Sequence, residues 1–394
     1  MQINLLVVQS VAWGGMECQT VGLGNVLVRR GHRVRIVEVG HRTFSESGRQ
    51  FGEIGLVHVD PPKPVREMGI GDWRRLFRTV PADVLVHAKG APNAGNLSLD
   101  LAARLSFHLC LNVEHSHMPL PPKQSRRHFG GLVPGLGLWW YRRRVAIFLR
   151  SLALHRIVCV SHSLLHHLHD DYLFPRRRME AIFNGIDTRQ FHPDDERRLK
   201  ARRAWGIPAG TLAIGTVGRL YFAKGQHILI DLFARLRKSL PEKDMRLIFV
   251  GIGPEEKSLK ARADQFGVAD QTLFAGFSDR PWEAYCGLDL FLLPSVIEAF
   301  GMALAEAMAS GTLVVCNDCG GMPEIVSSPD LGWVVPMNDL EALHAAVLAA
   351  LRVPEAERAE RQAFARQHVV QCFDSAAQFG RLADLIETLA GHRR

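Results

Sequence analysis

Short apolar runs alternate with stretches of helical spacing along this chain, and this alternation constrains the fold more than any other feature. In the first unit, the apolar run at residues 3–8 leads through Gly14 and Gly15 into a helical stretch at residues 16–30, and a second run follows at residues 34–39. Such alternation predicts parallel strands joined by helices that cover both faces of a sheet. Glycines at the carboxyl end of the first strand let the backbone approach a ligand there.

A charged, proline-containing connector, FHPDDERRLKARRAWGIPAG, divides this pattern into two halves. A chain of 394 residues is also too long for one ordinary core. We therefore predict an α/β fold with two Rossmann-like, doubly wound domains, residues 1–190 and residues 191–372. A C-terminal helix within residues 373–394 is expected to pack back on the first domain. The other runs of strand length are residues 55–59, 84–87, 109–114, 156–160, 212–217, 246–250, 272–275, 288–293 and 312–315.

An acidic pair flanks a glycine-marked helix start in the stretch PSVIEAFGMALAEAMASG. The backbone amides of Phe300, Gly301 and Met302 are predicted to point out of the helix N-terminus, where the helix dipole favours an anion. Within the helix, Glu306 is suited to accept hydrogen bonds from ribose hydroxyls, and Glu298 before it is suited to accept them from a transferred sugar. Taken alone, the pair is equally compatible with two surface glutamates on an amphipathic helix.

Two basic residues follow the first strand of the second domain, in the stretch TVGRLYFAKGQ. Arg219 offers a planar fork for phosphate oxygens, and Lys224 offers a flexible point charge. Together they can neutralise a departing diphosphate, which is the task that a metal performs in other enzymes. The sequence has no Asp-x-Asp motif, so we expect neither a metal nor another cofactor. A solvated basic loop is the alternative.

These motifs resemble glycosyltransferase family four, whose members have the GT-B fold. The resemblance implies that the two Rossmann-like domains face each other across a cleft. The resemblance covers the whole chain in order and is more specific in its second half. Besides the two stretches above, it rests on GGME after the first strand, RGHRV before the second, NGID at residues 184–187, and GG with PEIV at residues 320–326.

The family resemblance implies an activity and a role for each matching residue. It implies that Arg219 and Lys224 bind the donor diphosphate, that Glu306 binds the ribose, and that Glu298 and the amides after it bind the sugar. It also implies that a hexose-type sugar moves from a nucleotide-sugar to a glycan acceptor, with retention of anomeric configuration by front-face attack. We expect UDP rather than GDP in the donor.

The first domain matches this family less closely. Members carry a histidine near the cleft after a mid-domain strand, and the stretch VEHSHMP offers His115 and His117. His115 is favoured because it directly follows the strand, although a core or surface histidine is the alternative. The backbone amides at Gly14 and Gly15 are expected to approach the donor phosphates or the acceptor, unless these glycines form a plain turn.

A cluster of aromatic and basic residues lies in the first domain. Aromatic rings favour the lipid headgroup region, and arginines favour anionic lipid. The cluster therefore predicts contact with an anionic membrane and a lipid-linked acceptor, such as a lipopolysaccharide core or a polyprenyl-diphosphate glycan. A buried helix, or a grip on phosphorylated acceptor sugars, would also explain it. The cluster comprises Trp139, Trp140, Tyr141, Arg142, Arg143 and Arg144.

Cysteine usage and the N-terminus indicate a cytoplasmic protein, so membrane contact through the aromatic and basic cluster would be at the inner face of the cytoplasmic membrane. The seven cysteines have irregular spacing, and no export signal is evident. Cys316 and Cys319 form a CxxC without a second ligand pair, which favours a structural role over a metal or redox role. His162, His166 and His169 have helical spacing compatible with zinc, but histidines are also common on polar helix faces.

Other activities remain as alternatives. A sugar-nucleotide epimerase or a phosphorylase would use a similar fold and cleft. The net charge of +8 is compatible with nucleic-acid binding, but the sequence has no signature of a nucleic-acid-binding module, so no nucleic-acid partner is expected. A catalytically silent sugar-binding module is disfavoured by the complete set of Arg219, Lys224 and Glu306.

Overall fold

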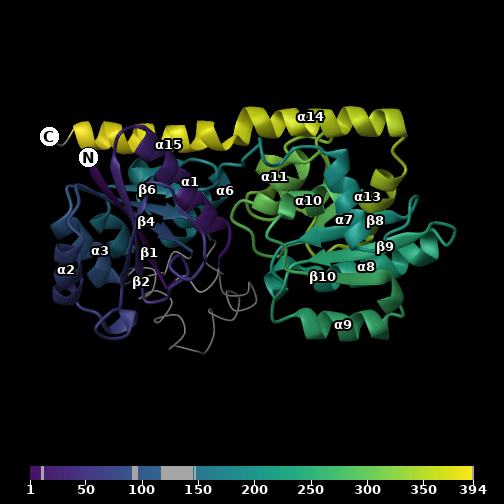
Figure 1. The fold of residues 1–394 in the computed structure, drawn as a ribbon, viewed down its shortest axis with the longest axis horizontal. Helices are drawn as coiled ribbons and strands as arrows, with labels where there is room; N and C mark the ends of the chain where they lie inside the picture. The colour runs from purple at the N-terminus through teal and green to yellow at the C-terminus, as the bar shows by residue number, and fades with distance from the viewer. Residues whose placement is uncertain (10–12, 91–95, 117–144, 146–147, 393–394) are drawn as a thin grey trace, which may run out of the picture. The chain divides into compact units, whose positions relative to one another are not determined.

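The structure is a computed structural model, and it describes residues 1–9, 13–90, 96–116, 145 and 148–392. The chain forms two compact units. Unit 1 comprises Met1–Gly185 and Ala376–Arg394, and unit 2 comprises Ile186–Ser375. Each unit contains one parallel sheet with helices along its faces (Figure 1). This is the doubly wound α/β architecture that the alternating pattern predicted.

Unit 1 is built on a seven-stranded sheet in the order β3-β2-β1-β4-β5-β6-β7, in which every neighbouring pair is parallel. Its strands are β1 (Gln2–Val8), β2 (Arg33–Val39), β3 (Gly55–Val59), β4 (Val84–Lys89), β5 (Leu109–Glu114), β6 (Arg156–Cys159) and β7 (Met179–Ala181). Its labelled helices are α1 (Gly15–Arg29), α2 (Ile70–Thr79), α3 (Leu97–Ser106), α6 (His162–His166) and α15 (Ser375–Gly391).

The C-terminal helix α15 packs on α1 within unit 1. A Cβ atom on Gly22 would lie 2.3 Å from the ring of Phe379, so the absence of a side chain at this position allows the two helices to approach closely. At the end of α1, the Arg30 guanidinium pairs with Asp384 of α15 at 2.6 Å. The last residues of the chain therefore complete the unit that its first residues begin.

Unit 2 repeats the architecture with six strands in the order β10-β9-β8-β11-β12-β13, again all parallel. Its strands are β8 (Leu212–Val217), β9 (Met245–Val250), β10 (Thr272–Gly276), β11 (Leu290–Leu293), β12 (Leu313–Asn317) and β13 (Trp333–Val335). Its helices are α7 (Asp195–Ala204), α8 (Gln226–Ser239), α9 (Glu256–Gln265), α10 (Pro281–Gly287), α11 (Met302–Ala309), α12 (Met322–Ile325), α13 (Leu340–Leu351) and α14 (Glu355–Phe373).

The division between the units falls between Gly185 and Ile186, a few residues before the expected position at 190. Gly185 is held in unit 1, because its backbone N–H and C=O both bond the side-chain amide of Gln19 at 2.8 Å. Ile186 is held in unit 2, because its N–H donates to Phe373 at 2.8 Å and its C=O accepts from Ser375 at 2.9 Å. The change of partner at adjacent residues explains the position of the boundary.

The charged connector is an integral part of unit 2. Half of it forms α7, which begins where the Asp194 carboxylate accepts from the Arg197 N–H at 2.9 Å. On this helix, Arg202 is largely buried and reaches Asp289 at 3.1 Å, ahead of β11. The charged side chains of this segment thus help to hold α7 against α10 and the start of β11.

In each sheet, the first strand lies beside the point where the strand order reverses. β1 has β2 on one side and β4 on the other, and β8 has β9 and β11. Open α/β sheets bind ligands outside the carboxyl ends of strands at such a reversal. Gly14 follows β1 and Gly218 follows β8, so both glycine-containing loops occupy these positions. Among the helices that the structure describes, we find none with the length and apolar character required to cross a membrane.

Candidate functional site

Two loops meet at the carboxyl edge of the unit 2 sheet, one after β8 and one after β11. The first ends in a 3₁₀ turn, Phe222–Lys224, followed by Gly225 in the left-handed conformation with φ 71°. A Cβ on Gly225 would lie 2.0 Å from the Pro294 carbonyl oxygen in the second loop. Only glycine permits both this backbone conformation and this approach, which explains the KG pair in the sequence.

This approach brings Lys224 onto Glu298. The Lys224 Nζ lies 2.6 Å from the Glu298 Oε2, and the two side chains are 31% and 14% exposed. The Ser295 hydroxyl lies 3.5 Å from the same carboxylate oxygen. Two residues that the sequence assigned to a donor site are therefore in direct contact, although 74 positions separate them.

Arg219 lies at the start of the same loop, and its side chain is exposed. Its guanidinium carbon is 5.3 Å from the centroid of the Tyr221 ring, and its backbone carbonyl accepts from the Gln226 amide at 2.9 Å. Within the described part of the chain, we find no carboxylate paired with Arg219. Its positive charge is thus available to an anionic ligand, whereas that of Lys224 is balanced by Glu298.

The loop after β11 ends at Gly301, which has φ 108° and precedes the first residue of α11, Met302. A Cβ on Gly301 would lie 3.0 Å from the Met322 side chain. Phe300 before it is buried, and its ring lies edge-on to Phe373 with centroids 5.5 Å apart. The aromatic contact fixes the loop, and the glycine turns it into the helix.

Glu306 lies on α11, one of whose neighbours is α10. The Tyr285 hydroxyl donates a 2.7 Å hydrogen bond to the Glu306 Oε2. Desolvation by the surrounding protein raises the pKa of Glu306 to about 7, and the hydrogen bond from Tyr285 opposes this rise. Near neutral pH, the protonated and ionised forms of this carboxyl group are therefore both populated.

In unit 1, His115 directly follows β5, and its backbone N–H donates to Lys89 at 3.0 Å. Burial lowers the pKa of His115 to about 4, although a hydrogen bond with the Asn184 side chain opposes the effect. The imidazole is therefore neutral at pH 7. Gly14 precedes α1 and Gly15 begins it, so these two glycines lie at the start of the helix after β1.

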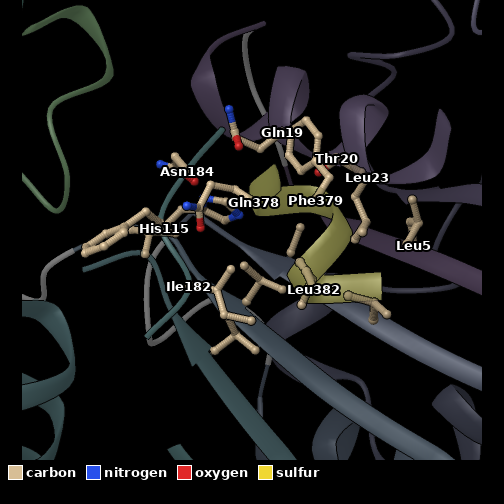
Figure 2. Close-up of a pocket in the computed structure, with 16 residues that line it drawn as sticks. Leu5, Gln19, Thr20, Leu23, His115, Ile182, Asn184, Gln378, Phe379 and Leu382 are labelled. Carbon is tan, nitrogen blue, oxygen red and sulfur yellow. The ribbon is translucent and has the colours of Figure 1, made fainter. Parts of the chain in front are cut away.

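His115 lies in the wall of a mostly apolar pocket of unit 1. Figure 2 shows His115, Asn184 and Gln378 toward one end and Leu5, Leu23 and Leu382 toward the other. The pocket is partly open to solvent, and the centre of a water-sized sphere can occupy about 30 Å³ of it.

The chain matches two models of known glycosyltransferase domains. Residues 13–190 match the model described as Glycosyltransferase Family 4, and residues 197–368 match the one described as Glycosyl transferases group 1. The chain belongs to glycosyltransferase family four. Both units of this glycosyltransferase are thus accounted for by family models.

Two curated relatives of this glycosyltransferase are named for different activities. The chain is 28% identical to N-acetyl-alpha-D-glucosaminyl L-malate synthase of Bacillus anthracis, over 92% of this chain and 91% of that protein. It is 31% identical to the lipopolysaccharide core biosynthesis mannosyltransferase LpsB of Rhizobium meliloti, over 52% of this chain and 66% of that protein.

Among solved structures, HepE of Anabaena in complex with UDP and glucose has a TM-score of 0.79 at 20% identity, covering 98% of this chain and 99% of that one. This likeness confirms the GT-B fold of the glycosyltransferase.

Sequence reasoning missed several side chains that support the predicted site. Tyr285 contacts Glu306, Asn184 contacts His115, and Gln19 holds Gly185 next to Asn184. The NGID motif signalled Asn184, but nothing in the sequence paired it with a histidine. Tyr285 and Gln19 lie on helices, and the position of an uncharged polar residue on a helix does not indicate its hydrogen-bond partner.

A buried charge cluster lies at the ends of β4 and β5, directly before His115. The Lys89 Nζ lies 3.6 Å from Asp100 and 3.7 Å from Glu114, and the Arg150 Nε lies 2.7 Å from Asp100. Lys89, Asp100 and Glu114 are almost fully buried. Desolvation raises the pKa of Glu114 and lowers the pKa of Lys89. The cluster is balanced in charge and fixes the strand ends that carry His115.

Several predicted features give no site in the described part of this glycosyltransferase. Among the residues that the structure describes, no three or more histidine, cysteine, aspartate or glutamate side chains are grouped so that they could hold a metal ion. Cys316 and Cys319 are free and buried, and burial raises the pKa of both thiols, that of Cys319 to about 11. They are protonated at neutral pH and poorly suited to redox chemistry. His117 and the cluster from Trp139 to Arg144 lie outside the described residues.

Proposed function

We propose that this glycosyltransferase moves a hexose-type sugar from a nucleotide-sugar, UDP-linked rather than GDP-linked, to a glycan acceptor with retention of anomeric configuration. The contact between Lys224 and Glu298 carries the proposal. It joins a cation suited to the diphosphate and a carboxylate suited to the sugar at the edge where open sheets bind ligands. HepE, which has the same fold, was solved with UDP and glucose.

Arg219 and Lys224 would hold the donor diphosphate. Arg219 provides a planar fork with no carboxylate partner in the described structure, and Lys224 provides a charge that Glu298 keeps in place. Charge developing on the diphosphate as the glycosidic bond breaks is stabilised by such preorganised cations. We therefore propose that the reaction needs no bound metal.

The remaining donor contacts would come from the loop after β11 and from α11. Glu298 accepts hydroxyls of the sugar, and the amides of Phe300, Gly301 and Met302 lie at the positive end of α11. Glu306 accepts hydroxyls of the ribose. In the transfer, a bond forms between the acceptor oxygen and the anomeric carbon on the face that the diphosphate leaves. The bonding electron pair departs with the diphosphate, and the proton of the acceptor hydroxyl passes to a departing phosphate oxygen.

His115, Gly14 and Gly15 would serve the acceptor and the sugar from unit 1. A neutral imidazole can donate and accept hydrogen bonds without acting as an acid at pH 7. We propose a lipid-linked acceptor at the inner face of the cytoplasmic membrane, with the cluster Trp139, Trp140, Tyr141, Arg142, Arg143 and Arg144 on anionic lipid. The support is the composition of the cluster and the lipopolysaccharide role named for LpsB.

Thermal stabilisation by nucleotide-sugars tests the donor. UDP-glucose, UDP-N-acetylglucosamine and GDP-mannose are compared, since a ligand at 100 times its Kd adds about 2.7 kcal/mol to the free energy of unfolding. We expect a rise in Tm with a UDP-sugar that is lost in Arg219→Ala. Absence of stabilisation by every nucleotide-sugar, in a folded protein, would overturn the proposal.

Liposome sedimentation tests the acceptor side. Replacing Arg142, Arg143 and Arg144 with Gln should weaken binding to anionic liposomes at low salt, since each basic residue contributes about 1 kcal/mol there. Nucleotide-sugar hydrolysis should be unchanged. A wild-type protein that does not sediment with such liposomes removes the support for a lipid-linked acceptor and leaves the donor site untouched.

A further inference from the structure

Tyr285 is almost fully buried on α10, and its ring and its hydroxyl have separate contacts. The ring lies edge-on to Phe191 and Phe291, with centroids 5.9 Å and 5.6 Å away. The hydroxyl reaches Glu306 at 2.7 Å. Phenylalanine would satisfy the ring contacts equally well, so packing does not explain the hydroxyl. A buried hydroxyl is costly unless it is hydrogen-bonded, and here its partner is the carboxylate assigned to the ribose.

We infer that Tyr285 is a positioning residue for donor binding, because its hydroxyl holds the Glu306 carboxylate in place and favours the ionised form that accepts ribose hydroxyls. This inference rests on the proposed function, since it takes Glu306 as the ribose ligand. A hydrogen bond donated to a carboxylate stabilises its charged form. It occupies one acceptor position on Oε2, and the carboxylate retains others for two hydroxyls.

The electrostatic surroundings of Glu306 leave Tyr285 as its main support. The elements packed against α11 also carry other titratable groups, among them Glu283 and Cys286 on α10, Cys316 on β12, Glu324 on α12, and Arg366 and His368 on α14. In the described structure, Tyr285 is the only one of these residues that is hydrogen-bonded to Glu306. Burial works against ionisation, and the phenol works in its favour. Donor affinity should therefore change with pH near neutrality. The Tyr285 hydroxyl should set the pH at which this change occurs.

Affinity for UDP-glucose and GDP-mannose between pH 5.5 and pH 8.5 tests the inference. These sugar diphosphates lack the terminal phosphate that titrates near pH 6 in free UDP or GDP. Wild-type affinity should fall below about pH 7, as Glu306 becomes protonated. In Tyr285→Phe, we expect the midpoint to rise by about one pH unit, the effect of losing a hydrogen bond to a charged group. Affinity should then be about five-fold weaker than in the wild type at pH 7, and nearly equal at pH 8.5.

Tyr172→Phe is the matched control, because Tyr172 is also fully buried but belongs to unit 1. It should follow the wild-type profile. A constant ratio of affinities between wild type and Tyr285→Phe across the pH range, including a ratio of one, would overturn the inference and leave the proposed function standing. If the folded wild type binds neither nucleotide-sugar at any pH, the proposed function fails and the inference fails with it.

Discussion

Replacing Glu306 with glutamine should make the protein more stable and a poorer binder of its donor. The wild-type carboxyl group has a pKa of about 7, against an ordinary value of 4.5, because it is desolvated. Its ionisation therefore opposes folding. The unfolded chain ionises near pH 4.5, while the folded protein retains the proton up to about pH 7. The free energy of unfolding falls across this interval and stays lower above it. Glutamine keeps the shape and an acceptor for Tyr285 but carries no charge.

The size of the gain follows from the pKa difference. A shift of about 2.5 pH units at 1.36 kcal/mol per unit gives about 3 kcal/mol as an upper value. Glu306 is only partly buried, so we expect about 1 to 3 kcal/mol at pH 8. In a unit of this size, each kcal/mol moves Tm by about 2 to 4 °C, so the expected rise is roughly 2 to 12 °C. At pH 5, where the unfolded carboxyl group is already partly ionised, the gain should fall to about a quarter of its value at pH 8.

Differential scanning calorimetry on the full chain at pH 5, 6, 7 and 8 measures this difference. Glu355→Gln is the control, because its carboxylate lies on α14 in the same unit and is 95% exposed. Its Tm should follow the wild type at every pH. A gain in Glu306→Gln that is equal at pH 5 and pH 8, or no gain at pH 8, would refute the assignment of a desolvated carboxylate at Glu306. Donor affinity measured at pH 8 should fall in the same variant, by about 1.5 to 3 kcal/mol in binding free energy.

Three further predictions concern the chemistry of the site. Arg219→Ala and Arg219→Lys should both lower kcat/KM, the former by about 10²-fold, because lysine restores the charge but not the bidentate geometry; steady-state kinetics on folded variants that show full rescue by lysine would contradict this. Turnover should persist in excess EDTA, and activity that is lost with the chelator and restored by magnesium or manganese would contradict metal independence. The fall of kcat/KM on acidification should occur at the same pH in His115→Asn as in the wild type. The reason is that the pKa of His115 is about 4, whereas that of Glu306 is about 7. If the pH–rate profile is displaced in the variant, the titration belongs to His115.

The strands and their order of occurrence followed from the sequence where apolar runs were long. The run at residues 109–114 is β5, and the run at residues 212–217 is β8. Sequence analysis missed β7 (Met179–Ala181) and β13 (Trp333–Val335), which are three residues each and lie at sheet edges. Such short edge strands have no room for a periodic pattern, and their pairing depends on the neighbouring strand.

The candidate site was also predictable only in part, because the sequence identified its residues but not their contacts. Lys224, Gly225 and Glu298 stood out because glycine and charge are rare beside buried strands, but their mutual contact depends on how two loops fold back at one sheet edge. The dependence of Gly225 on the Pro294 carbonyl illustrates this, since only the folded structure shows the 2.0 Å approach. The charged connector was misleading for the opposite reason. Its composition is typical of a linker, but Arg202 is buried against Asp289.

The position of α15 has a consequence for how this protein is made. Unit 1 begins with the first residue but includes Ala376–Arg394, whereas unit 2 is complete at Ser375. On the ribosome, the second unit therefore has its whole sequence while the first still lacks the helix that covers Gly22 and pairs with Arg30. Domains usually fold in the order in which they are synthesised. Here the later unit can finish first, and a chain that stops short of residue 376 leaves the N-terminal unit, not the C-terminal one, without its full core.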